Sequence, residues 1–297
     1  MGVAVTRSSG PRHVRVDTHL HLSRWWNDLP RTGYRPDIDY TVKGLLAEMD
    51  RNGIDYGVVI QLHEAPSVRD GLDEGRRNAE TAKGRLLPVT TVDPTRGEEE
   101  VAAAIDLWEH DPTVRGVKLY PGYQPFYVHD KRVEPILEFA HRRKLPVLVH
   151  QGDTLERNGL VKYARPIELD EVAVRYRDVR FVLCHLGNPW INEATELVWK
   201  NENVYTDTSG LLAHPSAPLF DRMAKQARDL IEQAVVTVGR PDQFLYGSDW
   251  PLEELRTAVR VVNTVDLPLD HRVNILGENA CRLFGLPTRP PSRPGAS

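Results

Sequence analysis

Histidine side chains stand in this sequence where they could bind a metal ion together. His19 and His21 are separated by one residue at the end of a short apolar run. Alternate side chains of a strand point to the same side, so these two imidazoles can bind one cation together. An isolated pair of this kind also arises by chance or from core packing. By itself, the pair is weak evidence for a metal site.

Three more residues of suitable type end other apolar runs. His150 follows Val147–Val149, His185 follows Cys184, and Asp249 lies near the end of the last such run. If the protein had no metal or acid/base centre, the position of each of these three residues would need a separate structural explanation. The whole set, rather than any single member, therefore predicts a metal or acid/base centre.

Short apolar runs rich in β-branched residues alternate with longer stretches of helical periodicity, a pattern typical of parallel strands joined by helices. We identify eight strand candidates: Val14–Asp17, Tyr56–Gln61, Leu86–Val92, Gly116–Tyr120, Pro146–His150, Arg180–His185, Val204–Asp207 and Gln243–Gly247. The expected helices include Thr41–Asn52, Arg96–His110, Asp130–Lys144, Pro166–Arg177, Ile191–Asn201 and Ser216–Val238. Eight such units predict an α/β protein with a single-domain (β/α)8 TIM barrel, whose active site lies where the strands end.

The expected barrel covers residues 14–286, preceded by an extension at residues 1–13 and followed by a disordered tail at residues 287–297. The tail consists mainly of Pro, Arg, Ser and Gly, without apolar periodicity. The stretch Leu22–Asp39 is long for a connection between a strand and a helix, so we expect an insertion near the exit of the first strand.

Composition excludes several classes of protein. The 38 basic and 42 acidic residues leave a net charge of −4, which gives no basic surface for nucleic acid. The two cysteines, Cys184 and Cys281, lie in apolar runs and do not form a disulfide framework. No run approaches the length needed to cross a membrane. We expect a cytoplasmic protein that acts on a small molecule, and the sequence leaves a homo-oligomer open.

Four segments together resemble the amidohydrolase superfamily, in the branch that includes aminocarboxymuconate semialdehyde decarboxylase and pyrone dicarboxylate lactonase. They are Asp17–His21, Val182–Gly187, Leu245–Pro251 and Ile275–Leu286, and the resemblance spans Val14–Leu286. The resemblance implies that His19, His21, His150 and Asp249 bind a metal, and that His185 acts beside it as the catalytic acid/base. The expected cofactor is one divalent ion, with zinc first and manganese or iron as other choices.

Lys118 leaves the number of metal ions open. Its segment Gly116–Tyr120 resembles the fourth strand of dihydroorotases, in which a carboxylated lysine bridges two metals. The lysine could instead bind a substrate carboxylate or line the rim. A second metal and a carboxylated lysine require each other, because neutralising a buried ammonium in this way makes sense only beside cationic metal. We expect an unmodified lysine and a single metal.

A cation held by neutral imidazoles and a carboxylate can lower the pKa of a bound water toward about 7. This chemistry predicts hydrolysis of a C–N or ester bond in a cyclic amide, imide or lactone. Asp249 would accept a proton and return it to the leaving group, while His185 orients the water or stabilises the oxyanion.

Two other functions stay open. One is nonoxidative decarboxylation of an aromatic or muconate-like acid, although His63 and Glu64 stand where an arginine would favour it. The other is a non-catalytic scaffold, which predicts a missing ligand, and none is missing. The candidates for substrate binding are Trp25, His63, Tyr120, Tyr123, Asn188, Trp190 and Trp250.

Overall fold

Eight short strands form one parallel sheet in which neighbours in the sequence are neighbours in space. The computed structural model describes residues 12–23, 38–212 and 218–291. The strands are β1 (Val16–Leu20), β2 (Tyr56–Ile60), β3 (Leu86–Thr91), β4 (Val117–Leu119), β5 (Val147–Val149), β6 (Phe181–Leu183), β7 (Val204–Asp207) and β8 (Phe244–Leu245). Each lies within or close to a predicted run.

The sheet closes on itself through β1 and the segment that follows β8. The backbone N–H of Thr18 donates to the carbonyl of Tyr246 at 2.9 Å. Two residues further along β1, Leu20 forms a parallel bridge with Trp250. The predicted (β/α)8 barrel is therefore confirmed, with all connections between consecutive parallel strands.

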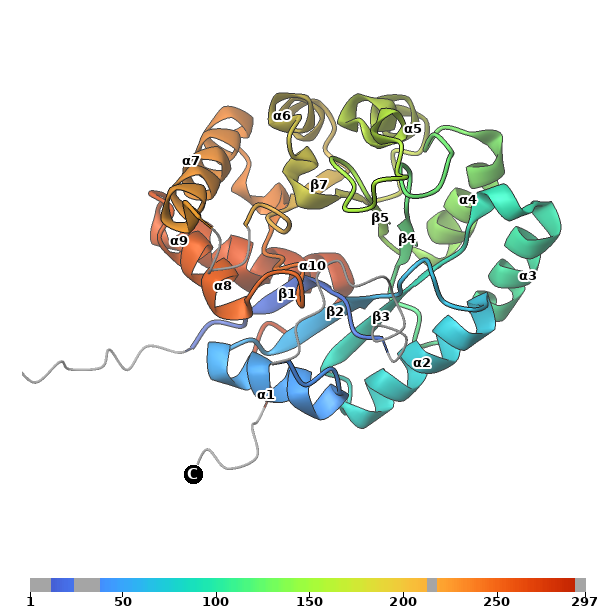
Figure 1. Cartoon of the computed structure of the whole chain (residues 1–297), viewed down its shortest axis with the longest axis horizontal. Helices are drawn as coiled ribbons and strands as arrows, with labels where there is room; N and C mark the ends of the chain where they lie inside the picture. Colours follow the sequence, from blue (N-terminus) through green and yellow to red (C-terminus); the bar gives the residue numbers. More distant parts are fainter. Residues whose placement is uncertain (1–11, 24–37, 213–217, 292–297) are drawn as a thin grey trace, which may run out of the picture.

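Helices α1 to α8 lie around the outside of the sheet (Figure 1). They are α1 (Val42–Asn52), α2 (Val68–Thr81), α3 (Glu98–Glu109), α4 (Glu134–Arg143), α5 (Asp170–Arg175), α6 (Ile191–Lys200), α7 (Phe220–Val238) and α8 (Leu255–Asn263). After them come α9 (Leu269–Val273), the π-helical η8 (Asn274–Glu278) and α10 (Asn279–Phe284). The structure thus adds α2 and α8 to the helices expected from periodicity.

Local sequence explains where the helices begin and end. The Thr41 side chain accepts the N–H of Gly44 and caps α1, and Ser67 caps α2 through the N–H of Asp70. Gly53 ends α1 in the left-handed conformation, with φ of +73°. These caps set the helix boundaries, which determine how each chain segment returns to the barrel.

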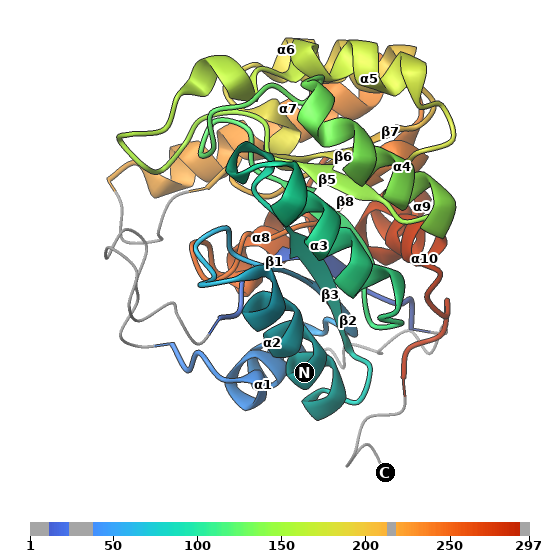
Figure 2. The same ribbon diagram turned by 90° about the vertical axis from the view of Figure 1, so that its right-hand side faces the viewer.

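Two apolar layers hold the barrel together, and the alternation of strand side chains separates them. In β5, Val147 and Val149 belong to the layer between strands and helices, whereas Leu148 belongs to the layer inside the barrel. Leu283 and Phe284 of α10 extend the layer inside the barrel, where they join residues at the amino ends of the strands. Figure 2 shows α10 near one end of the sheet. The functional side chains lie at the opposite, carboxyl ends of the strands.

Some predicted features cannot be compared with the structure. Trp25 and most of the expected insertion lie outside the described residues, as do most of the amino-terminal extension and the end of the tail. Within the described parts of the chain, no helix is long and apolar enough to span a membrane.

Candidate metal centre and active site

His19 and His21 point to the same side of the barrel, as their spacing predicts. The register between β1 and β2 shifts between Asp17 and Leu20. The shift marks a strand irregularity of the kind that re-aims side chains near functional sites. Leu20, between the two histidines, packs in the layer outside the barrel. The centroids of the two imidazole rings are 5.1 Å apart at the end of β1.

Asp249 joins this pair from the segment after β8. Its Oδ1 lies 3.3 Å from Nε2 of His21 and 3.6 Å from Nε2 of His19. Asp249 has φ of +58°, a left-handed conformation that is uncommon for residues other than glycine and often marks a functional site. The backbone N–H of Asp249 donates to the carbonyl of His19 at 2.9 Å, which fixes the two segments together.

The hydrogen bonds of the two imidazoles leave their Nε2 atoms available. Nδ1 of His19 donates to Oδ2 of Asp207 at 2.9 Å, and Nδ1 of His21 donates to the carbonyl of Ile60 at 3.2 Å. Among the described residues, the buried Nε2 of His19 and Oδ1 of Asp249 have no hydrogen-bond partner. Buried acceptors without a donor are costly. These three side chains could hold a metal ion, which would satisfy all of them.

His185 lies beside this group and follows β6 in an unusual backbone conformation. Its φ is +62°, and that of Leu186 is +48°. Its ring centroid is 4.6 Å from that of His19 and 5.1 Å from that of His150. His185 is thus next to the possible metal ligands and lines the cavity above them.

His150 lies on the other side of His185. It follows β5, and its Nε2 donates to the carbonyl of Asp153 at 2.9 Å. The structure does not gather its nitrogens with those of His19 and His21, but its ring lines the same cavity. In the described conformation, Nδ1 is therefore its free nitrogen.

Lys118 is buried in β4 and lines the floor of the cavity. Its Nζ donates to Sγ of Cys184 at 2.9 Å. Burial raises the pKa of this thiol to about 12, so the cysteine is protonated at neutral pH. The sequence therefore placed Lys118 correctly near the centre, while its modification stays untested.

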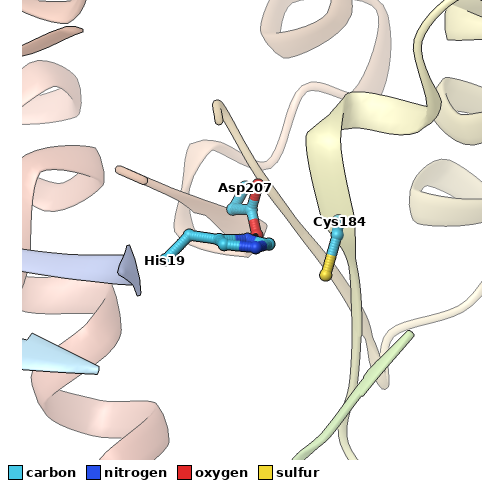
Figure 3. Close-up of side chains that lie close together, drawn as sticks. All are labelled: His19, Cys184 and Asp207. Carbon is cyan, nitrogen blue, oxygen red and sulfur yellow. Dashed lines mark hydrogen bonds and ion pairs between the residues drawn. The ribbon is translucent and has the colours of Figure 1, made fainter. Parts of the chain in front are cut away.

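Cys184, His19 and Asp207 form a second group with metal-ligand spacing. In Figure 3 the ring of His19 reaches from β1 toward the Asp207 carboxylate, and the Cys184 thiol comes from the segment after β6. Asp207, however, already accepts hydrogen bonds from His19, Ser209 and the backbone of His185. Because its carboxylate is occupied and the thiol is protonated, this group is less suited to a metal than the group with Asp249.

Burial favours the neutral form of three imidazoles, and neighbouring histidines favour the ionised form of Asp249. Burial lowers the pKa of His185 to about 3, with His19 as a further cause, and it lowers the pKa values of His19 and His150 as well. Burial alone would raise the pKa of Asp249, but the contacts with His21 and His19 hold it below its usual range. Neutral imidazole and ionised carboxylate are the forms that bind a metal.

A cavity of about 340 Å³ opens above these side chains. His63, Tyr120, Tyr123 and Asn188 line it, as predicted, together with Glu64, Asp153, Glu156, Glu253 and several leucines. The Tyr120 hydroxyl donates to the carbonyl of Gln61 at 2.7 Å. The volume suits a small organic molecule.

The structure places two of the predicted substrate-binding residues away from the described part of the cavity. Trp250 is buried in the outer apolar layer, where its ring packs 6.0 Å from that of Tyr40. The left-handed turn at Asp249 directs that carboxylate inward and the next side chain outward. Trp190 lies at the start of α6, which is outside the barrel. Its ring lies under the guanidinium of Arg165. Neither tryptophan lines the cavity.

Sequence reasoning missed two polar residues that contact the centre, Asp207 and Ser209. Asp207 ends β7, and its carboxylate binds His19. Ser209 Oγ lies 2.8 Å from Nδ1 of His185. The sequence carries a signal for Asp207, which ends a predicted strand in the same way as His150 and His185, whereas Ser209 follows that strand without such a signal.

A barrel with histidines and an aspartate at the carboxyl ends of its strands is the architecture of metal-dependent hydrolases and lyases. The amidohydrolase family model matches residues 16–286. The chain therefore belongs to the amidohydrolase family, as the four motifs predicted, and it is an enzyme of that superfamily. The family is generally metal-dependent, in agreement with the histidine and aspartate group.

Solved structures share the fold at low sequence identity. A 5-carboxyvanillate decarboxylase from Sphingomonas paucimobilis is 15% identical, with a TM-score of 0.67 over 92% of this chain and 99% of that chain. An amidohydrolase from Burkholderia multivorans with bound HEPES is 19% identical, with a TM-score of 0.69 over 92% and 100%. A probable 2-pyrone-4,6-dicarboxylic acid hydrolase from Acinetobacter baumannii with citric acid bound is 17% identical, with a TM-score of 0.65 over 92% and 99%. No curated protein matches the chain.

Proposed function

We propose that this protein is a metal-dependent hydrolase that cleaves a C–N or ester bond in a small molecule such as a cyclic amide, imide or lactone. The observation that carries the proposal is the convergence of His19, His21 and Asp249 on one point, with two buried acceptor atoms unpartnered. A catalytic cation satisfies such acceptors, whereas a core packed only for stability would pair them.

His19, His21 and Asp249 would hold the ion, with His150 adding a nitrogen from the β5 side. Zinc fits this ligand set best, and manganese or iron also suits it. When bound, a divalent ion supplies an acidified water and polarises a carbonyl oxygen of the substrate. The hydrogen bond from His19 to Asp207 fixes the ring orientation and raises the basicity of its Nε2.

The remaining groups of the chain would move protons and orient the substrate. Asp249 would accept a proton from the attacking water as the water oxygen bonds to the substrate carbonyl carbon. It would then return this proton to the leaving nitrogen or oxygen. His185 lies next to the same point, where it orients the attacking water. Tyr123 and Asn188 line the cavity, where they would position the rest of the substrate.

Decarboxylation of an aromatic or muconate-like acid is the second candidate. It is supported by the decarboxylases among the similar folds, which include a 2,6-dihydroxybenzoate decarboxylase with its substrate bound. The buried Lys118 supplies a cation near the centre that could attract a carboxylate. Hydrolysis stays preferred because the side chains of Glu64, Asp153 and Glu156 also line the described part of the cavity, where negative charge would repel the carboxylate of an acid substrate.

One assay of the metal-loaded enzyme separates the two reactions. Purified protein loaded with zinc, manganese or iron is offered lactones, cyclic amides and imides, and in parallel aromatic and muconate-like acids. Addition of one water to the substrate without release of carbon dioxide, followed by mass spectrometry, is expected for the first group, and His19→Asn should abolish it. Release of carbon dioxide, with deuterium from D2O entering the ring, would replace hydrolysis by decarboxylation as the function.

A further inference from the structure

A chain of hydrogen bonds connects Asp207, Ser209 and His185 beneath the cavity. Ser209 Oγ donates to Oδ1 of Asp207 in a short contact, and the same oxygen lies 2.8 Å from Nδ1 of His185. Asp207 and Ser209 are fully buried, so water does not compete for these contacts. Both residues belong to β7 and the loop directly after it.

The number of protons shared by these three hydrogen-bonded side chains determines which nitrogen of His185 carries hydrogen. Both oxygens of Asp207 accept N–H groups, Oδ2 from Nδ1 of His19 and Oδ1 from two backbone amides, which is the pattern of an ionised carboxylate. An ionised carboxylate only accepts, so the single hydroxyl proton of Ser209 points to Asp207. The lone pairs of Ser209 then face Nδ1 of His185, which must donate.

The rest of the network agrees with this arrangement. Oδ1 of Asp207 also accepts the backbone N–H groups of His185 at 2.9 Å and Ser209 at 3.1 Å. Oδ2 accepts from Nδ1 of His19 at 2.9 Å. One carboxylate therefore orients His19 directly and His185 through Ser209, and it holds the backbone of the β6 exit in place.

We propose that Ser209 is a positioning residue that holds neutral His185 with its proton on Nδ1 and an unprotonated Nε2 available to the cavity. His185 then begins the reaction as a hydrogen-bond acceptor that orients the attacking water, whose proton Asp249 takes up, and it cannot donate from Nε2 until it has itself taken up a proton. This inference rests on the proposed function for its catalytic meaning, but the state of the ring is a property of the protein alone. It favours a reaction that starts with deprotonation of water over one that starts with protonation of a ring carbon.

The state of the ring can be measured without substrate or metal. Metal-free protein labelled with 15N-histidine is studied by two-bond 1H–15N correlation, and His185→Gln assigns the signals of this ring. The wild type should show a protonated Nδ1 and an unprotonated Nε2. Ser209→Ala should shift both nitrogens of His185 toward the average of two exchanging forms, whereas Ser209→Thr, which keeps the hydroxyl, should retain the wild-type pattern.

Turnover provides the second measurement. In the metal-loaded enzyme, Ser209→Ala should lower kcat by roughly ten- to a hundredfold with little change in KM, and Ser209→Thr should recover most of the loss. Thr208→Val removes a neighbouring buried hydroxyl whose side-chain hydrogen bonds, within the described part of the chain, are with the backbone of Gly247, so it controls for packing. Metal content is measured in each variant, because Ser209 Oγ also lies 3.1 Å from Nδ1 of His19.

The outcomes separate this inference from the proposed function. A wild-type His185 protonated at Nε2, or a Ser209→Ala spectrum identical to the wild type, overturns the role of Ser209 whatever the reaction is. If the spectra agree with the proposal but the enzyme releases carbon dioxide, the proposed hydrolysis fails and the positioning role stands. If Ser209→Ala is unfolded, the wild-type spectrum and Ser209→Thr still decide the matter.

Discussion

Oδ1 of Asp17 accepts the backbone N–H of Ser248 at 3.1 Å and thereby links the first strand to the segment after the last one. The same oxygen accepts the N–H of His19 at 3.0 Å. Asp17 therefore holds the backbone next to two possible metal ligands, His19 and Asp249, without being a ligand itself. Its place at the seam where the barrel closes makes it a structural support of the centre.

Replacing Asp17 should destabilise the protein. Asp17→Ala leaves two buried N–H groups without an acceptor, so we expect a loss of roughly 2 to 4 kcal/mol in the free energy of unfolding. Urea unfolding of metal-free protein measures the loss. Asp229→Ala, which removes an exposed carboxylate on α7, should change stability by less than about 0.5 kcal/mol. Equal effects of the two substitutions would refute the supporting role.

The proposed ligands and the proposed acid/base residue should separate in metal content. His19→Asn and His21→Asn each remove a nitrogen that faces Asp249, so both variants should lose the metal in elemental analysis. His185→Asn should retain it and reduce turnover on the order of a hundredfold or more. His141→Asn, on the exposed face of α4, is the matched control. Loss of metal from His185→Asn would make His185 a ligand instead.

Lys118 should be unmodified, and the protein should bind one metal ion per chain. Its Nζ already donates to Cys184, an arrangement that suits an ammonium and not a carboxylated nitrogen. Elemental analysis of metal-replete protein should give one equivalent, and 13C spectra in labelled bicarbonate should lack a carbamate signal. Two equivalents together with such a signal would establish a binuclear centre.

His63 should make the stability of the metal-free protein depend on pH. Burial first, and then the charge of His21, lower its pKa to about 4 from an unperturbed value near 6.5. As pH falls below about 6.5, His63 takes up a proton in the unfolded state, whereas in the folded state it stays unprotonated until the pH approaches 4. The contribution of His63 to the free energy of unfolding is therefore complete above pH 6.5 and is lost as pH falls toward 4. His63→Gln should therefore lose less stability than the wild type between pH 6.5 and 4 in urea titrations. A steeper loss of unfolding free energy in His63→Gln than in the wild type would contradict the predicted direction of the pH dependence.

Periodicity and spacing predicted the barrel because both follow from local rules. Strand alternation separates Leu148 from Val147 and Val149, and the same rule places His19 and His21 on one side. Since every parallel strand of a closed barrel ends at the same rim, His150, His185 and Asp249 could be expected there without knowledge of the contacts.

The tertiary structure alone decided which of these side chains meet and which atoms remain free. Left-handed backbone at His185 and Asp249 breaks the alternation, so their directions and the outward position of Trp250 do not follow from strand periodicity. The partners that select the free nitrogens, Asp207 and Ile60, come from distant parts of the chain. A hydrogen bond between residues about 190 positions apart depends on the closure of the barrel, and no local pattern in the sequence encodes it.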